Sequence, residues 1–250
     1  VIYGTVYKNA SRLIVNNMCY LLMVGFVILT RLDFDMAVRQ FIIAVAAACI
    51  SLVIPTFMLR VRMVDKWGAF LGAFGFIMIA SVFVLGKSMY GATNWISIGG
   101  FSLQPSELAK IVFVFFVAAM LARDTSFKRI VITTAVAAAY VLVLVVEKDL
   151  GAAVIFFITY LVMLFVATRQ FRYMALGLGA GTGAAIVAYK MFDHVKTRVV
   201  AWKDPWGNYN DAGYQIAQSL FAIGTGGWFG MGLFKGKPET IPVVVSDFVF

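Results

Sequence analysis

A carboxylate and an ammonium group three residues apart mark one place where this sequence could do chemistry. Glu107 and Lys110 lie at the start of an apolar stretch, and on a helix their side chains would share a face. Pro105 suits the first helical turn, where its missing amide hydrogen costs nothing, and the carboxylate would lie near the positive helix end. An ion pair that anchors the helix and a partner for a charged ligand are both open interpretations.

A second charged group, Glu147-Lys148-Asp149, forms a short turn between two apolar stretches. Its simplest interpretation is a solvated hairpin tip. The topology predicted below, however, places this turn on the same side of the membrane as Glu107 and the polar segment 193–246. Three polar groups that converge on one face are typical of a site built from loops on a rigid helical scaffold.

The polar segment 193–246 is far longer than a connection between two helices requires, and such loops usually either work or are disordered. Its many aromatic and β-branched residues argue against disorder. Lys196, Arg198 and Lys203 could bind phosphate, arginine through a bidentate fork and lysine as a point charge. The Gly-rich part is not a phosphate-binding P-loop, because the Gly-x4-Gly-Lys-Ser/Thr pattern is absent from the sequence.

Two acids follow these cations in the sequence. Asp204 or Asp211, as a carboxylate beside cations, could act as a general base on a sugar hydroxyl. Turn formation is the alternative for both, since Asp204-Pro205 and Asp211-Ala212-Gly213 are good turn sequences. The residue types alone leave both interpretations open.

The composition excludes an ordinary soluble domain. Of the 250 residues, 62% are hydrophobic and only 13% are charged, which is typical of a polytopic membrane protein. The formal net charge of +9 could suggest a nucleic-acid binder, but no basic stripe lies outside the positions that flank the apolar stretches. The positive-inside bias of membrane proteins explains the charge better.

Hydropathy predicts an all-α bundle of seven membrane spans and one large extracytoplasmic loop, 193–246, on the rule that a span needs about 20 mainly apolar residues. Ten Lys and Arg residues fall in one set of short loops and four in the other, which places the richer set in the cytoplasm. Residues 247–250 look like the start of a further, truncated span, so we treat the chain as a fragment. The expected bundle covers residues 1–192, with spans near 17–30, 41–59, 67–86, 108–122, 130–146, 150–168 and 173–192.

These groups, in this order, resemble the FtsW/RodA/SpoVE family, the SEDS proteins of bacterial cell-wall synthesis. The resemblance covers nearly the whole chain and rests on several independent motifs. The motifs are Asn94-Trp95-Ile96 through Gln104-Pro105-Ser106-Glu107-Leu108-Ala109-Lys110, Glu147-Lys148-Asp149-Leu150-Gly151, Gly213-Tyr214-Gln215 through Gln218-Ser219, and the segments 222–227, 230–233 and 241–250.

The resemblance implies a fold of about ten membrane helices, of which this chain would supply seven, in the bacterial plasma (inner) membrane. It implies a peptidoglycan glycosyltransferase of the hexosyltransferase type that polymerises lipid II and releases the undecaprenyl pyrophosphate carrier. Such a protein serves cell division or cell shape. The expected partners are a class B penicillin-binding protein, which crosslinks the product, and other division or elongation proteins. The fragment alone could be inactive.

The resemblance also implies roles for particular residues. The sugar phosphate at the reducing end is the leaving group, cations hold its pyrophosphate, and Asp211 or Asp204 deprotonates the attacking hydroxyl. No metal-ligand spacing is visible in the sequence, but a divalent cation bound through the substrate pyrophosphate would leave none. The expected substrate-binding residues are Trp95, Gln104, Glu107, Lys110, Glu147, Lys148, Asp149, Lys196, Arg198, Lys203, Gln215, Gln218 and Ser219.

The sequence departs from the family at one position that matters. Members usually have Asp-Pro-x-Gly-x-Gly-Tyr-Gln in the large loop, with the essential aspartate seven residues before the glutamine. Counting back from Gln215 leads to Asn208, and an amide is no general base. Asp211 is our first choice for the role, Asp204 is the second, and an inactive member is the third possibility.

Two further functions compete with the glycosyltransferase. A lipid-linked precursor flippase or transporter should have charged or broken helices near mid-membrane and often inverted repeats. The predicted spans contain almost no ionisable residues near their centres, and the sequence has no internal repeat that we can detect. A non-catalytic scaffold for a division or elongation complex would differ from the enzyme only in lacking turnover.

Overall fold

The computed structural model describes residues 7, 11–60, 67–89, 92–98, 101–122, 124–232, 235–242 and 244. The chain divides into two units, which we treat separately. The first unit comprises Val1–Arg60 and Thr197–Phe250, and the second unit comprises Val61–Lys196.

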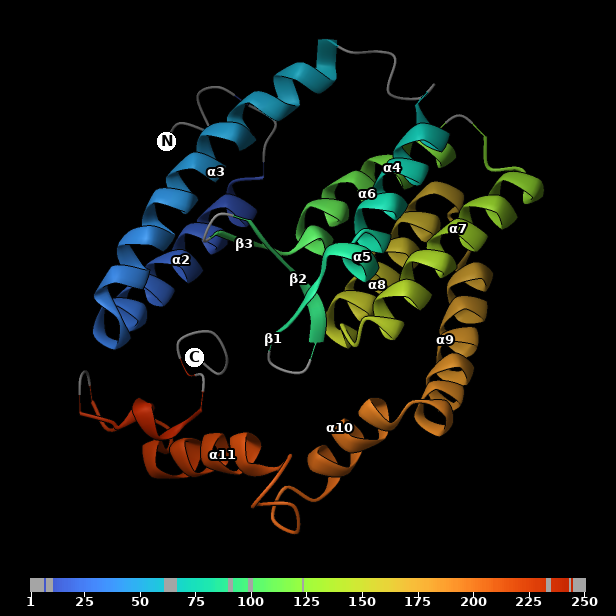
Figure 1. Ribbon diagram of the computed structural model, residues 1–250. Coiled ribbons are helices and arrows are strands. Elements are labelled where there is room, and N and C mark those ends of the chain that lie inside the picture. The colour runs from blue at the N-terminus through green and yellow to red at the C-terminus, as the bar shows by residue number, and fades with distance from the viewer. Residues whose placement is uncertain are drawn as a thin grey trace. The chain divides into compact units, whose positions relative to one another are not determined.

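The second unit is a bundle of helices with an aromatic core. Figure 1 shows four of them side by side: α4 (Gly68–Ala80), α6 (Pro105–Leu121), α7 (Phe127–Val146) and α8 (Leu150–Thr168). The short helix α5 (Val82–Leu85) continues from α4, and α9 (Phe171–Met191) packs on α8. Rings from three helices meet in the centre, where the Phe113 centroid lies 5.1 Å from that of Tyr140 and 4.8 Å from that of Phe156.

Glycines on α4 allow the bundle to pack closely. The Tyr140 hydroxyl donates a hydrogen bond of 2.6 Å to the Gly72 carbonyl, so the polar end of this buried ring is satisfied. A Cβ atom on Gly72 would lie 2.8 Å from the Phe116 ring, and one on Gly75 would lie 2.5 Å from the Tyr140 hydroxyl. Only glycine fits these two positions without a shift of the neighbouring rings.

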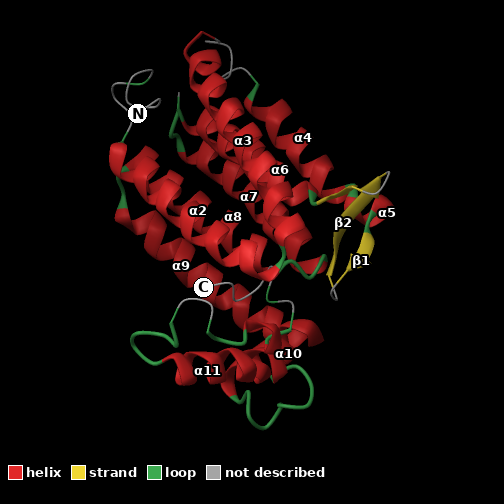
Figure 2. Cartoon of the chain, turned by 90° about the vertical axis from the view of Figure 1, so that its left-hand side faces the viewer, coloured by secondary structure: helices red, strands yellow, loops and turns green. Residues whose placement is uncertain are grey.

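A small antiparallel sheet precedes α6. Its strands β1 (Lys87–Met89), β2 (Ala92–Ile98) and β3 (Phe101–Leu103) lie in the order β1-β2-β3 and are yellow in Figure 2, which labels β1 and β2. The register pairs Lys87 with Trp95 and Ile96 with Leu103. Only Gln104 lies between the end of β3 and Pro105, the first residue of α6, so the sheet fixes where this helix starts.

The first unit contains two long helices and the helical parts of the polar segment. Helices α2 (Arg12–Leu32) and α3 (Phe34–Arg60) pack against each other, and the Phe26 and Phe41 rings meet edge to face at 5.8 Å. The polar segment begins with α10 (Asp193–Lys203), which starts at the end of the second unit, and continues with α11 (Tyr214–Gly226) and the 3₁₀ helix η2 (Pro238–Thr240).

The all-α polytopic class is confirmed, apart from the small sheet, which the sequence did not predict. Among the described residues, six helices are long and apolar enough to cross a membrane. The remaining predicted span corresponds to α6, which has 17 residues. Several helices extend beyond the predicted ranges because a hydropathy window trims charged ends that a helix tolerates; α2, for example, includes Arg12 and Arg31.

We expect Gly72→Ala to destabilise the protein. The added methyl would press on the buried Phe116 ring, and overpacking of this kind typically lowers the free energy of unfolding by roughly 1–3 kcal/mol. Gly179→Ala in α9 is the matched control, since nothing lies within 4 Å of the position of its Cβ atom. The control should be neutral, or stabilise by up to about 1 kcal/mol through helix propensity. Thermal unfolding in detergent compares the two, and equal stability would contradict the packing described here.

Candidate active site

The carboxylate of Asp149 connects the Glu147-Lys148-Asp149 turn to the segment that contains Glu107 and Lys110. Its Oδ1 accepts a hydrogen bond of 3.0 Å from the Ala152 amide and so caps the N-terminus of α8. Its Oδ2 accepts from Gln104 Nε2 at 2.8 Å and from Ser106 Oγ at 3.4 Å. The turn and the start of α6 are therefore in direct contact, as expected, and Asp149 makes that contact.

The turn that presents Asp149 has a specific backbone geometry. Lys148 has a φ of 66°, the left-handed conformation usually occupied by glycine. The Lys148 amide donates to the Val145 carbonyl at 3.1 Å, and the Asp149 amide donates to the Leu144 carbonyl at 2.9 Å. These two bonds form a Schellman motif that closes α7 and reverses the chain. An ordinary residue in this conformation costs on the order of 1 kcal/mol, which other contacts must offset.

Glu147 does not lie in solvent, contrary to the interpretation of this turn as a solvated tip. Its side chain is 1% exposed, and neither carboxyl oxygen has a hydrogen-bond partner among the described residues. Burial, with a smaller contribution from the charge of Asp149, raises the pKa of Glu147 to about 8. At neutral pH this carboxyl is therefore largely protonated, while Lys148 is exposed at the tip.

Glu107 and Lys110 form an ion pair, which is one of the two interpretations that the sequence left open. Their side chains form an ion pair of 2.7 Å on the first turns of α6. The Lys110 side chain is 27% exposed and that of Glu107 is 59% exposed. An ion pair this accessible contributes at most about 1 kcal/mol to the free energy of unfolding. Stabilisation of the fold is therefore a weak reason for these two charges to lie at the start of α6. Both charges lie within the motif that also contains Gln104 and Ser106, and they remain accessible to a ligand.

In the first unit, Asp204 helps to form a turn. Its Oδ1 accepts a hydrogen bond of 2.8 Å from the Gly207 amide, and its carbonyl accepts one of 2.8 Å from Asn208 Nδ2. The Asn208 carbonyl in turn accepts from the amides of Asp211 at 3.1 Å and Gly213 at 3.0 Å. Asn208 thus organises the loop through both its amide side chain and its backbone, which is a structural role.

Gly213 is required by this loop. A Cβ atom there would lie 2.5 Å from the Pro205 carbonyl oxygen and 2.9 Å from the Asn208 carbonyl oxygen. The loop is therefore folded tightly against itself at the start of α11. Asp211 lies two residues before this contact and is exposed, and no described group donates a hydrogen bond to its carboxylate. Of the two candidate acids, Asp211 is the one whose carboxylate is not used by the turn.

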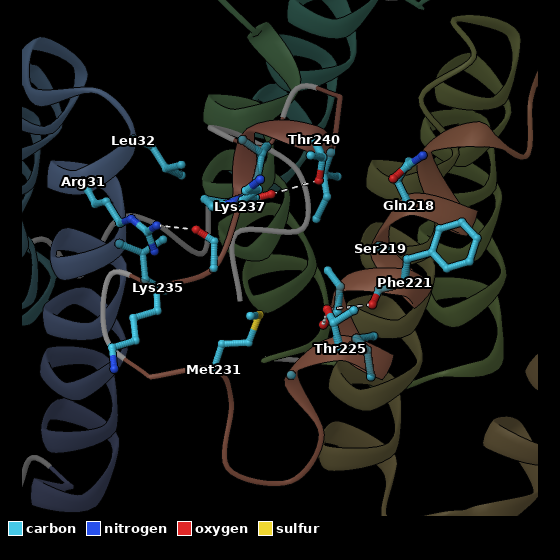
Figure 3. A pocket seen from close by; sticks show the side chains of 18 of the residues that line it. Arg31, Leu32, Gln218, Ser219, Phe221, Thr225, Met231, Lys235, Lys237 and Thr240 are labelled. Carbon is cyan, nitrogen blue, oxygen red and sulfur yellow. Dashed lines mark hydrogen bonds between the residues drawn. The ribbon is translucent and has the colours of Figure 1, made fainter.

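The polar residues of α11 bond mainly within the same unit. Gln215 Nε2 donates to the Pro242 carbonyl at 3.0 Å, and Gln218 Nε2 donates to the Tyr209 hydroxyl at 2.9 Å. The buried Ser219 hydroxyl donates to the Ile216 carbonyl at 2.7 Å. These contacts hold the loop around α11. Gln218 and Ser219 also line a cavity, shown in Figure 3.

The three cations expected to bind phosphate all lie on α10. All three side chains are exposed. Arg198 and Lys203 lie about 140° apart around α10, because a helix turns by about 100° per residue. Lys196 is the last residue of the second unit. Trp95, in β2 of the same unit, is half-buried, and the described contacts do not connect it to Asp149.

Beside Gln218 and Ser219, the cavity in the first unit is lined by cations that the sequence analysis did not select. It has a volume of about 770 Å³ and lies between the last turns of α2, helix α11 and the segment that follows it. Arg31, Lys235 and Lys237 line it. The closely spaced Lys235-Gly236-Lys237 was visible in the sequence, but nothing there connects it to Arg31. Among the described residues, no group of three His, Cys, Asp or Glu side chains could hold a metal ion.

Glu147→Gln should raise the unfolding temperature at pH 7 to 8 and leave it unchanged near pH 4. The folded protein keeps the Glu147 proton until the pH reaches about 8, whereas a glutamate of ordinary pKa loses it near 4.5. The free energy of unfolding of the wild type should therefore fall as the pH rises between these values. The amide of the Glu147→Gln variant does not titrate, so the variant should lack this part of the pH dependence. Thermal unfolding across this pH range tests it, with the exposed Glu107→Gln as matched control. An identical pH dependence in wild type and Glu147→Gln would contradict the assignment.

Asp149→Ala and Gln104→Ala should be energetically coupled. A hydrogen bond to a charged group contributes roughly 1.5–3 kcal/mol, so the double-mutant cycle should give a coupling free energy of about 1–3 kcal/mol. Asp149→Ala alone should lose a further ~1 kcal/mol with the helix cap. The pair Asp149→Ala and Lys110→Ala is the control and should be additive. Additivity of the Asp149 and Gln104 variants would show that their contact is not formed.

Comparisons with known proteins cover most of the chain. The family model FTSW_RODA_SPOVE, described as cell cycle protein, matches residues 11–250. The peptidoglycan glycosyltransferase RodA of Mycobacterium tuberculosis is 36% identical over 228 residues, which are 82% of this chain and 48% of that protein. The probable peptidoglycan glycosyltransferase FtsW of Aliivibrio salmonicida is 34% identical over 233 residues, 89% of this chain and 57% of that protein. The chain spans about half the length of the curated relatives it matches.

Solved structures share the fold. A chain of a peptidoglycan synthase complex that coordinates polymerization and crosslinking matches with a TM-score of 0.65 and 21% identity, over 89% of this chain and 67% of that chain. The crystal structure of the rod shape determining protein RodA of Thermus thermophilus matches with a TM-score of 0.56 and 22% identity, over 76% of this chain and 66% of that one. With the family model matched over residues 11–250, the chain belongs to the FtsW/RodA/SpoVE family and is a multi-pass membrane protein.

Proposed function

We propose that the whole protein is a peptidoglycan glycosyltransferase that polymerises lipid II on the outer face of a bacterial plasma membrane. The observation that carries this proposal is the 36% identity, over 228 residues, to a relative named for that activity. The sequence motifs of the first unit and second unit both fall within the matched family region.

Asp211 is our candidate for the general base. Its carboxylate is exposed and is not bound by a described donor, whereas Asp204 uses Oδ1 to hold the Gly207 amide. In the proposed step the carboxylate takes the proton of the attacking sugar hydroxyl. The hydroxyl oxygen bonds to C1 of the other sugar, and the bond from C1 to the pyrophosphate oxygen breaks, so that pyrophosphate leaves as an anion.

Charge stabilisation of the leaving pyrophosphate needs cations that substrate can reach. Arg198 and Lys203 are exposed but diverge around α10, so one of them, rather than both, would contact a given phosphate. We also propose that a divalent cation enters on the substrate pyrophosphate, because phosphate oxygens are ligands that Mg²⁺ commonly uses. An unchanged polymerisation rate in excess EDTA would exclude that cation.

In the second unit, the surroundings of Asp149 suit a headgroup site. The exposed charges of Glu107 and Lys148 and the half-buried charge of Lys110 lie on the segments that the Gln104 to Asp149 contact ties together. These charges could bind the peptide or sugar of the substrate, while Asp149 holds their helices in place. We assign Asp149 and Gln104 as positioning residues, because their polar groups are used within the protein.

Orientation and partners complete the proposal. The excess of Lys and Arg in the alternate loops supports a cytoplasmic location for those loops and an outer location for residues 193–246. A solved chain of similar fold belongs to a complex that couples polymerization and crosslinking. We therefore propose a class B penicillin-binding protein as partner, which co-purification from a bacterial membrane would test. Failure of the two proteins to co-purify would count against it.

Asp211→Asn should lower lipid II polymerisation by about 10²-fold or more, the usual contribution of a general base. Asp204→Asn is the matched variant and should retain most activity, because an asparagine oxygen can still accept the Gly207 amide. The full-length variants are compared by gel separation of glycan strands. Full activity in Asp211→Asn would refute the assignment, and loss in Asp204→Asn alone would move the base to Asp204.

A further inference from the structure

Two aromatic side chains project from the chain just after α11. Trp228 and Phe229, which we call the aromatic tip, are each 99% exposed. Neither residue lines the cavity of the first unit, so the tip is a separate feature of that unit. Large apolar side chains that lie together on a surface commonly mark a place that another molecule covers.

The backbone on both sides holds the aromatic tip away from α11. Gly227 ends the helix with a φ of 56° and a ψ of −154°, a combination that essentially only glycine adopts. Its amide donates a hydrogen bond of 3.0 Å to the Ile223 carbonyl. Gly230, directly after the tip, has a φ of 70°, which glycine adopts without a steric cost. A turn between two glycines therefore presents the two rings.

The aromatic tip lies near the end of a membrane span of the same unit. Helix α2 is long and apolar enough to cross a membrane, and Arg31 lies in its last turn. Gly227 and Met231, on either side of the tip, line the same cavity as Ile28 of α2. Figure 3 shows Arg31 and Met231 at this cavity. Because a span of about 20 residues just crosses the hydrocarbon core, its last turn lies at the boundary between lipid and water, and the tip lies beside it.

The chain around the aromatic tip carries no charge. Residues 212–234, which include α11 and the tip, contain no Asp, Glu, Lys or Arg. Charged side chains are costly where a segment enters lipid, so their absence suits a segment that lies against a bilayer. Tryptophan prefers the headgroup level of a membrane, where its ring contacts lipid and its Nε1–H can still donate a hydrogen bond.

We propose that the aromatic tip inserts into the headgroup region of the bilayer beside α2 and so anchors the end of α11 to the membrane surface. The bilayer already surrounds α2 at this depth, which favours the lipid surface over a second protein as the partner. Insertion removes the apolar surface of both rings from water. The tip is not among the residues assigned to glycosyl transfer, and the proposal does not rest on that activity.

Fluorescence quenching of a probe at the aromatic tip tests the proposal. Phe229→Cys, in the full-length protein with its native cysteines replaced by serine, is labelled with nitrobenzoxadiazole and reconstituted into vesicles of phosphatidylethanolamine and phosphatidylglycerol. A phosphatidylcholine that is spin-labelled near the top of its acyl chain should quench this probe. Aqueous iodide should quench it at least about twofold less than a probe in water, since interfacial apolar groups reach roughly 5–10 Å into the bilayer boundary. Asn210→Cys, in an exposed polar turn of the same unit, is the matched control and should show the opposite behaviour.

Intrinsic fluorescence tests the unlabelled tip. The emission that Trp228→Phe removes should be quenched by brominated phosphatidylcholine in the wild type. The emission that Trp202→Phe removes should not be quenched, because Trp202 is exposed beside the charges of Lys203 and Asp204. Both variants change exposed rings and should unfold at the wild-type temperature.

Two results would overturn the proposal. Equal quenching by iodide in Phe229→Cys and Asn210→Cys would show that the tip lies in water. Exclusion of both iodide and the spin-labelled lipid from the Phe229→Cys probe would show that the tip packs against protein.

Discussion

The bonds made by one carboxylate, that of Asp149, hold the polar end of the second unit together. One oxygen satisfies an amide at the start of α8, where the first turn has donors without helical partners. The other oxygen accepts from Gln104, just before α6, and from Ser106 in its first turn. Two helix N-termini that are distant in the sequence are thereby fixed to the same anion.

The surrounding turn breaks several local rules at once. Lys148 adopts a left-handed backbone conformation, and Glu147 buries a carboxyl without a described partner. Either feature alone lowers stability, and natural proteins tolerate such conflicts mainly at functional sites. The raised pKa of Glu147 points in the same direction, since perturbed titratable groups cluster at such sites. These are the features expected of a turn that takes part in the headgroup site proposed above.

The helices and the Glu107 to Lys110 pair followed from the sequence because hydropathy and helical spacing are local properties. The short strands at 87–103 carry too few residues for a period of two to be detected. The burial of Glu147 depends on packing between helices, which a charged tripeptide does not reveal. Arg31 meets Gly236 across about 200 residues of chain, so no local pattern could place them at one cavity. The role of Asn208 likewise appeared only when its bonds to Asp204, Asp211 and Gly213 were known.

Polymerisation of purified lipid II tests most directly whether the whole protein makes glycan, as we propose. Full-length wild-type protein would be assayed alone and with the proposed class B penicillin-binding partner, and the products would be separated on a gel. We expect long glycan strands, at least in the presence of the partner. No strands under any partner condition would contradict it and would favour a scaffold or a flippase, with Asn208 at the usual aspartate position as the reason for inactivity.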